Sequence, residues 1–423
     1  MRRFLLALSV LILFLSPLPA VCPQPASAPA KSAKVTVVLD QITPTLLTAY
    51  LTSLVSYGPR STGTYGCQLA GDYIHDQFTS MGLATRFQNW TGWGNRYNFH
   101  HFTDRNVEAT LPGTDPTDAS ILIFNAHFDN AHVSVGANDD GSGTAAVLAA
   151  AYALSHFTFN RTIRFVTFSG EEQGLIGSRA YLKEIYKRGD DVLLDIDADM
   201  IGHTETVEGA HAARLTVTED TGYATTVFQL ISDTYVDFTI TTHNLTRIQK
   251  NWGGSDYAAF VNDGYETIAC WEADHDPNMH TPADNLSNVN IAYLVNYTKL
   301  IAGTLATIAD ESLVPPQVRI VSPMQGTFSI HSRFVKDIEE RTTKCLNDFW
   351  LWAGVFHATR PIVRVSFYED GRLLGAVDTP PYKWHVQSRS IRTHEFLVVA
   401  IDSFGRTTSD VRDIHFLNLS LRH

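Results

Sequence analysis

Length, composition and charge set the first limits on this chain. It has 423 residues, of which 44% are hydrophobic and 18% charged, which is an ordinary globular composition in a length that favours two domains. The formal net charge of -12 argues against nucleic acid or an anionic membrane as a partner, because both require a basic surface. Small soluble substrates fit this composition better.

Residues 1–28 have the pattern of a secretory signal peptide. Arg2 and Arg3 precede an apolar run from residue 4 to about residue 18, and a stretch rich in Pro, Ala and Ser follows, with a cleavage site after Ala28. The alternative is a membrane anchor, but the run is short for a helix that spans a bilayer. We therefore expect a secreted, periplasmic or extracellular protein with no membrane span after cleavage.

The cysteines do not predict a structural framework. Cleavage after Ala28 leaves Cys67, Cys270 and Cys345, an odd number without C-x-x-C spacing. Neither a thiolate metal site nor a disulfide scaffold is therefore indicated, although one bridge stays open.

Residues 35–312 alternate predicted strands and helices. This is the βαβ rhythm of a mainly parallel, mixed sheet flanked by helices on both faces, so we predict an α/β domain. The predicted strands are 120–126, 161–168, 192–196, 214–218 and 266–271, and the predicted helices are 142–156, 177–187, 223–236, 256–262 and 288–309.

After residue 312 a Val-Pro-Pro segment marks a linker, and the pattern changes to strands. We predict a small all-β sandwich over residues 316–420, similar to bacterial immunoglobulin-like modules, with no catalytic set and a role that the sequence leaves open. Asp370-Gly371 is typical of a hairpin turn, and residues 335–343 carry the only helical pattern. The predicted strands are 318–321, 362–367, 372–377 and 395–401.

Five separated stretches of the α/β segment carry side chains that a divalent cation accepts. Open α/β sheets place ligand sites beyond the carboxyl ends of their strands, and three of these stretches follow predicted strands, so we expect them to converge. Together they supply two imidazoles, three carboxylate ligands and a spare glutamate, a set that suits two zinc ions and an activated water. The stretches are His127-Phe-Asp129, Asn138-Asp139-Asp140-Gly, Gly170-Glu171-Glu172, Asp199-Met-Ile-Gly and Met279-His280-Thr.

Asp139 is the best candidate for a bridging ligand. It lies beside Gly141 and Gly143, which allow a tight turn, and one carboxylate can bridge two ions about 3.5 to 4 Å apart. The alternative for this stretch alone is a surface turn that caps a helix.

Glu171 and Glu172 are neighbours at a strand end, where consecutive side chains point apart. We assign Glu172 as a metal ligand and Glu171 as the general base that moves a proton from water to the leaving amine. An isolated Glu-Glu pair would more simply be a solvated strand end.

His127 and His280 are the predicted imidazole ligands. Asp129, two residues beyond His127, is the expected partner that fixes its tautomer. Most of the 17 histidines must have other roles, and we exclude His132, His156, His203 and His275 from the site.

The motifs together resemble the co-catalytic di-zinc aminopeptidase family, which includes secreted bacterial leucine aminopeptidases. The resemblance spans most of residues 50–310. It is carried by Tyr-Gly-Pro-Arg-Ser-Thr-Gly at 57–63, His-x-Asp at 127–129, Asn-Asp-Asp-Gly-Ser-Gly at 138–143, Gly-Glu-Glu-x-Gly at 170–174, Asp-Met-Ile-Gly at 199–202, Ser-Asp-Tyr at 255–257 and His-Thr-x-x-Asp at 280–284.

The resemblance implies two Zn²⁺ ions that share Asp139. His127 and Asp199 complete the ligands of one ion. Glu172 and His280 complete those of the other.

The resemblance also implies roles around these ligands. Glu171 is the implied base, Asp129 and Asp256 are the implied supports behind the ligands, and a non-proline cis peptide is expected between Asp139 and Asp140.

Two positions depart from the family pattern. Met279 stands where some relatives carry a tyrosine that stabilises the oxyanion, and Tyr257 stands where many carry histidine. The oxyanion donor therefore stays open.

From the motifs and the signal peptide together, we predict an exported zinc aminopeptidase that acts on peptides. The alternatives are a glutamate-releasing carboxypeptidase, a glutaminyl cyclase, or a metal-free, receptor-like binding protein.

Overall fold

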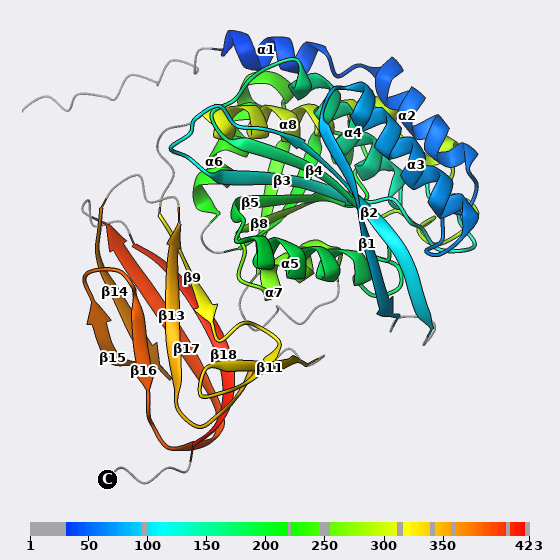
Figure 1. Cartoon of the computed structure of the whole chain (residues 1–423). Coiled ribbons are helices and arrows are strands. Elements are labelled where there is room, and N and C mark those ends of the chain that lie inside the picture. Colours follow the sequence, from blue (N-terminus) through cyan, green and yellow to red (C-terminus); the bar gives the residue numbers. More distant parts are fainter. Residues whose placement is uncertain are drawn as a thin grey trace, which may run out of the picture. The chain divides into compact units, whose positions relative to one another are not determined.

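The computed structural model contains helices around one mixed sheet up to residue 310 and only strands from residue 317 onward (Figure 1). The predicted fold class is therefore confirmed. The predicted signal peptide at 1–28 lies outside the described residues, and the immunoglobulin-like assignment of the C-terminal strands stays a prediction. The structure describes residues 31–94, 100–218, 221–245, 254–310, 316–338, 343–356, 361–402 and 407–418.

The N-terminal part is built on an eight-stranded sheet with the order β1-β2-β4-β3-β5-β8-β6-β7. The four central strands β4, β3, β5 and β8 run parallel to one another, and β2 and β6 pair with them antiparallel on either side. Every residue of β3 is buried, as expected for a strand with helices on both faces. The strands are β1 Ala84–Trp93, β2 His101–Leu111, β3 Ser120–His127, β4 Thr162–Phe168, β5 Asp191–Ala198, β6 Ala212–Val217, β7 Thr239–Asn244 and β8 Thr267–Glu272.

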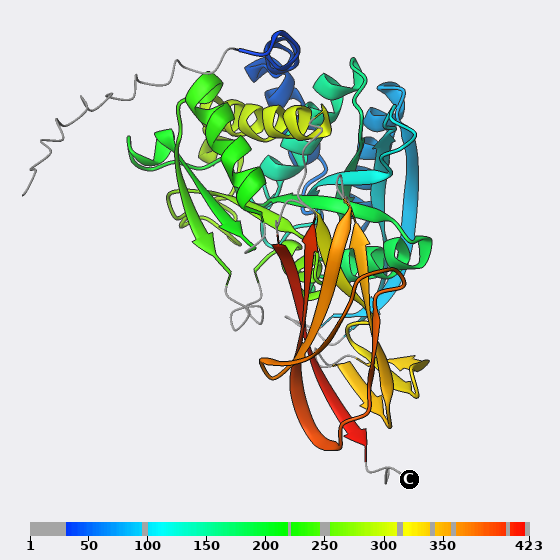
Figure 2. The same cartoon turned by 90° about the vertical axis from the view of Figure 1, so that its left-hand side faces the viewer.

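Eight α-helices in the described residues cover the two faces of this sheet. Figure 1 shows α1 to α4, α6 and α8 on one face and α5 and α7 on the other, and Figure 2 shows the blue N-terminal helices and yellow-green α8 on the same side. The helices are α1 Ala33–Asp40, α2 Pro44–Ser56, α3 Tyr65–Ser80, α4 Gly141–Ser155, α5 Ile176–Arg188, α6 Gly222–Ile231, α7 Tyr257–Asn262 and α8 Ile291–Asp310.

The predicted strands and helices of this part are all present. Their ends differ from the predicted ends by a few residues, and the predicted helix at 223–236 continues from α6 into a π-helical segment at Ser232–Val236. No helix or strand is predicted at α1, α2, β1, β2 or β7.

Local sequence signals explain where several helices begin. Thr43 caps α2 by accepting a hydrogen bond from the Leu46 N–H at 3.2 Å, and Pro44 occupies the first turn. Thr64 caps α3 in the same way, accepting from the Cys67 N–H at 3.3 Å. Asp140 caps α4, and this cap sits inside the candidate site rather than at the surface.

The main hydrophobic core lies between the sheet and the larger group of helices. The Ala-rich α4 is buried along most of its length, because its small side chains let it approach both the sheet and α8. α8 is long and apolar enough to cross a membrane, but 72% of its most apolar window is buried in the protein, as in a core helix.

The C-terminal part consists of a seven-stranded sheet, β11-β10-β12-β18-β17-β14-β15, and a three-stranded sheet, β16-β13-β9. Their shared core contains Phe349, Phe367, Phe396 and Phe416. The strands are β9 Gln317–Ser322, β10 Thr327–Ile330, β11 Arg333–Asp337, β12 Thr343–Leu346, β13 Phe349–Phe356, β14 Ile362–Glu369, β15 Arg372–Val377, β16 Lys383–Val386, β17 Ser390–Asp402 and β18 Thr407–Asn418.

Two local predictions for this part have opposite outcomes. Asp370-Gly371 is the turn between β14 and β15, with positive φ at both residues (47° and 76°), as a two-residue hairpin turn requires. The helical pattern at 335–343 is wrong where the structure describes it. Its first residues belong to β11, which pairs with β10 along a sheet edge, so a strand partner supplies the backbone hydrogen bonds that a helix would have formed internally.

The three cysteines in the described residues, Cys67, Cys270 and Cys345, are buried and free. These three cysteines therefore form no disulfide with one another.

Candidate metal centre

The candidate ligands meet at the carboxyl-terminal edge of the parallel strands. His127 is the last residue of β3, Asp199 follows β5 directly, and Glu171 and Glu172 lie just beyond β4. His280 comes from the loop after β8. Parallel strands end at the same edge of a sheet, so residues more than a hundred positions apart converge there.

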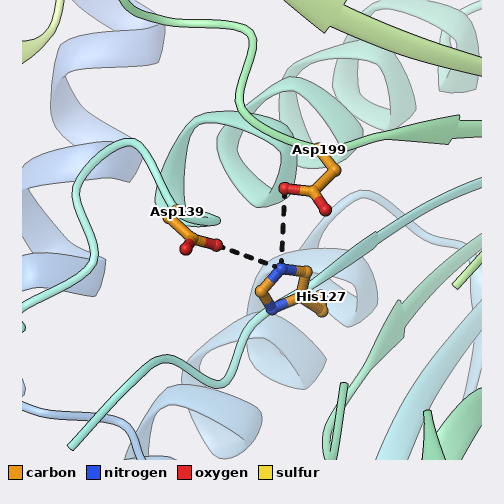
Figure 3. Close-up of side chains that lie close together, drawn as sticks. All are labelled: His127, Asp139 and Asp199. Carbon is orange, nitrogen blue, oxygen red and sulfur yellow. Dashed lines mark ion pairs between the residues drawn. The ribbon is translucent and has the colours of Figure 1, made fainter. Parts of the chain in front are cut away.

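The first group consists of His127, Asp139 and Asp199 (Figure 3). His127 Nε2 lies 3.3 Å from Asp139 Oδ1 and 3.7 Å from Asp199 Oδ1. One potential ligand atom from each residue lies within 4.8 Å of the others, so a single cation can reach all three.

The second group consists of Asp139, Glu172 and His280. His280 Nε2 lies 2.9 Å from Asp139 Oδ2 and 3.1 Å from Glu172 Oε1. Asp139 therefore directs one oxygen to each group, which is the arrangement required of a bridging carboxylate. The His280 side chain is 32% exposed while Glu172 is 1% exposed, so solvent reaches the site from the His280 side.

The donor chemistry of these groups fits a bound cation. Glu172 Oε2 is buried and accepts no hydrogen bond from the described residues, and the buried Glu172 Oε1 and Asp199 Oδ1 each face a histidine nitrogen, at 3.1 Å and 3.7 Å. Burying a carboxylate oxygen without a hydrogen bond destabilises the folded protein unless a cation lies beside it. Imidazole nitrogen and carboxylate oxygen are the donors that zinc accepts.

Asp129 supports both groups from behind. Its carboxylate accepts hydrogen bonds from the backbone N–H of Glu171 at 3.3 Å and of Glu172 at 3.4 Å, and from the Thr62 hydroxyl at 2.7 Å. Its backbone carbonyl lies 3.0 Å from His127 Nδ1, which directs Nε2 toward the carboxylates.

The supporting role of Asp256 stays a prediction. Asp256 is buried at the start of α7, where burial raises its pKa to about 7, and in the described part of the chain it hydrogen-bonds to neither group. At the start of α7, the Tyr257 N–H donates to Asp197, a residue of β5, at 3.3 Å.

The loop that carries the shared aspartate has the predicted backbone. The peptide between Asp139 and Asp140 is cis. Asp140 Oδ1 accepts the Gly143 N–H at 2.8 Å, and its Oδ2 accepts the His127 N–H at 3.3 Å. This stretch is thus both a helix cap and part of the candidate site.

Two residues of the sequence motifs, Arg60 and Asp284, hold this loop in place. The Arg60 side chain is fully buried and donates to the backbone carbonyls of Phe128 (2.7 Å), Val135 (2.6 Å) and Gly136 (2.8 Å). Asp284 accepts the N–H of Asn138 at 2.7 Å and of Asp139 at 3.1 Å. Their places in the 57–63 and 280–284 motifs were the only sequence signals for these roles.

The imidazoles stand among carboxylates, which favour their charged forms. Hydrogen bonds to Asp139 and Glu172 raise the pKa of His280 to about 11. Burial opposes the charge of His127, but Asp129, Asp139 and Asp199 outweigh it and raise its pKa well above the ordinary value. Without metal, both imidazoles are therefore protonated at neutral pH.

This protonation predicts that zinc binding releases protons. A zinc ligand must be a neutral imidazole, so each ion displaces a proton, and affinity should rise with pH between about 6 and 9. We expect zinc titrations in weakly buffered solution to release about two protons per chain, and His280→Ala to release about one fewer. A zinc affinity that is independent of pH would contradict this prediction.

The fold and the site together define a class: an α/β domain whose paired histidine and carboxylate groups suit a two-metal centre. Residues 106–305 match the model of Peptidase family M28. The predicted resemblance to the co-catalytic zinc aminopeptidase family is therefore confirmed over this segment.

Relatives with similar sequences cover part of the chain. It is 28% identical over 255 residues to aminopeptidase Y of Saccharomyces cerevisiae, covering 55% of this chain and 45% of the relative. It is 27% identical over 230 residues to a probable leucine aminopeptidase of Arthroderma otae (51% and 60%). It is 26% identical over 332 residues to leupeptin-inactivating enzyme 1 of Streptomyces exfoliatus (73% and 71%). The chain therefore spans only about half of the first two relatives.

Solved structures share the fold. The Legionella pneumophila LapA aminopeptidase aligns with a TM-score of 0.57 at 23% identity, covering 70% of this chain and 80% of that one. A Zn-dependent exopeptidase from Parabacteroides distasonis and a glutaminyl cyclase from Porphyromonas gingivalis each align with a TM-score of 0.53 at 18% identity, covering 63% of this chain and 98% of theirs.

Proposed function

We propose that this chain is an exported metalloaminopeptidase that uses two zinc ions to remove N-terminal residues from peptides. The observation that carries the proposal is Asp139, whose two oxygens face two separate histidine and carboxylate groups. The match of residues 106–305 to a peptidase family and the aminopeptidase names of several relatives support the reaction class. The predicted signal peptide supports export.

The proposed ligands divide into two pairs around the shared residue. His127 and Asp199 would hold one ion and Glu172 and His280 the other. When bound, the ions supply an activated water and polarise the carbonyl of the scissile peptide bond.

The protein's own residues would supply the proton transfer. Glu171 is buried beside Glu172, and both backbone N–H groups are held by the Asp129 carboxylate. We assign Glu171 as the base whose carboxylate takes a proton from the attacking water and gives it to the leaving amine. A substrate would enter on the exposed His280 side, and Asp129 would keep the Glu171 backbone fixed during the reaction.

The experiment is a peptide panel incubated with purified, zinc-loaded protein. We expect release of N-terminal amino acids that a chelator stops and added zinc restores, and N-acetylated versions of the same peptides should not be cleaved. Absence of any chelator-sensitive release would overturn the proposal. Release from the carboxyl end would instead indicate a carboxypeptidase, and cyclised N-terminal glutamine would indicate a glutaminyl cyclase.

A further inference from the structure

Asn138, the residue before the shared Asp139, is joined to a second buried polar residue. The Asn138 side chain is fully buried, and its Nδ2 lies 3.0 Å from both carboxyl oxygens of Glu272 and 2.9 Å from Asp276 Oδ2. Its Oδ1 accepts the Gly202 N–H at 3.0 Å. All the hydrogen-bonding atoms of this amide therefore have partners, which fixes the direction in which the chain enters Asp139.

Glu272 ends β8 and connects this loop to the one that follows Asp199. Its Oε2 accepts the N–H of His203 at 2.7 Å and of Gly202 at 3.2 Å, and its own N–H donates to the Met200 carbonyl at 2.8 Å. One carboxyl group thus contacts both the loop of the shared ligand and the loop of a ligand in the first group.

The Asp139 loop and the loop that follows Asp199 approach each other closely. A Cβ added at Gly202 would lie 2.8 Å from Asn138 Oδ1 and 3.0 Å from the Ser142 Cβ. Only glycine allows the two loops to meet at this distance, and Glu272 bonds to both of them at the meeting point.

The charge state of Glu272 suits this position. Burial raises the pKa of Glu272 to about 9, so the group is an uncharged acid at neutral pH. An uncharged group adds no negative charge beside the carboxylates of Asp139 and Asp199 and costs less to bury than an ion.

We propose that Glu272 is a positioning residue that holds the Asp139 and Asp199 loops at the spacing needed by the first metal group. It touches no proposed ligand side chain and acts through Asn138, Gly202 and His203. The inference rests on the proposed function for its activity readout, whereas its metal-binding readout does not depend on the reaction.

The test compares Glu272→Ala and Glu272→Gln with the unaltered protein. Glutamine keeps a carbonyl oxygen that can accept from Gly202 and His203, and alanine does not. We expect Glu272→Ala to weaken zinc binding about 10- to 100-fold in competition with a chromophoric chelator, and Glu272→Gln to stay within about threefold. Turnover of a peptide substrate should follow the same order, with kcat affected more than KM.

Asp274→Ala is the matched control. Asp274 lies two residues beyond Glu272 and accepts the N–H of Glu205 and of Thr206, both at 2.8 Å, so it joins the segment after β8 to the loop that follows Asp199 at a point farther from the ligands. Its removal should leave zinc affinity unchanged.

Each outcome decides the question. Wild-type zinc affinity in folded Glu272→Ala, or equal losses in the Gln and Ala variants, would overturn the proposal. If Glu272→Ala does not fold, Asn138→Ala replaces it and should weaken zinc binding to a similar extent. If the zinc results hold but the unaltered protein releases no amino acid, the positioning role stands and the proposed function fails.

Discussion

Replacing Glu171 with Gln is expected to lower kcat about a thousandfold while zinc binding stays intact. The amide has nearly the same shape as the carboxylate but cannot take a proton from water. Glu171 belongs to neither group of candidate ligands, so its charge is not needed to hold an ion. Steady-state kinetics on one peptide substrate and zinc content per chain give the two readouts.

The neighbouring variant Glu172→Gln is the matched comparison. Glu172 lies 3.1 Å from His280 and belongs to the second group, so its loss should remove zinc as well as turnover. If Glu171→Gln loses zinc to the same degree as Glu172→Gln, or keeps its turnover, the assignment of Glu171 as the base is wrong.

The second large effect is expected at Asp139. The Asp139→Asn variant keeps one oxygen and loses the negative charge, so it can no longer present a carboxylate oxygen to both histidines. We expect loss of zinc from both groups and a fall in turnover of at least about a thousandfold, because both the bound water and its activation depend on the metal pair.

Asp199→Asn provides the contrast for that measurement, because Asp199 belongs to one group only. It should weaken one ion and spare the other, which zinc titration would show as a single remaining tight site. Equal behaviour of the Asp139 and Asp199 variants would argue that Asp139 is not shared.

The central strands and the candidate ligands could be predicted because their signals are local. β3 is a continuous apolar run buried at every residue, and His127 stands at its end. The ligand motifs combine glycines with imidazoles or carboxylates beside such runs, so parallel-sheet geometry was enough to bring them together. The nearby glycines indicated Asp139 as a bridging ligand, and the family resemblance implied the two groups that share it.

The missed elements have weaker patterns. β1 is only partly buried and mixes charged, polar and aromatic residues, so its period is obscured. β13 alternates two exposed tryptophans with buried residues, and the local apolar density hides that alternation. Both strands are defined by pairing with distant partners rather than by their own composition.

The residues that support the ligands could not be predicted from local sequence either, because their partners are distant in the chain. Arg60 and the carbonyl of Gly136 are 76 residues apart, and Asn138 and Glu272 are 134 apart. A buried arginine or glutamic acid has no sequence signature of its own, because its role is set by whichever backbone groups the fold brings beside it.

The most direct test of the two-metal account is anomalous scattering at the zinc edge from crystals of the zinc-loaded protein. The account predicts two peaks about 3.5 to 4 Å apart. One peak should lie among His127, Asp139 and Asp199 and the other among Asp139, Glu172 and His280. A single peak, or peaks that Asp139 does not bridge, would contradict it.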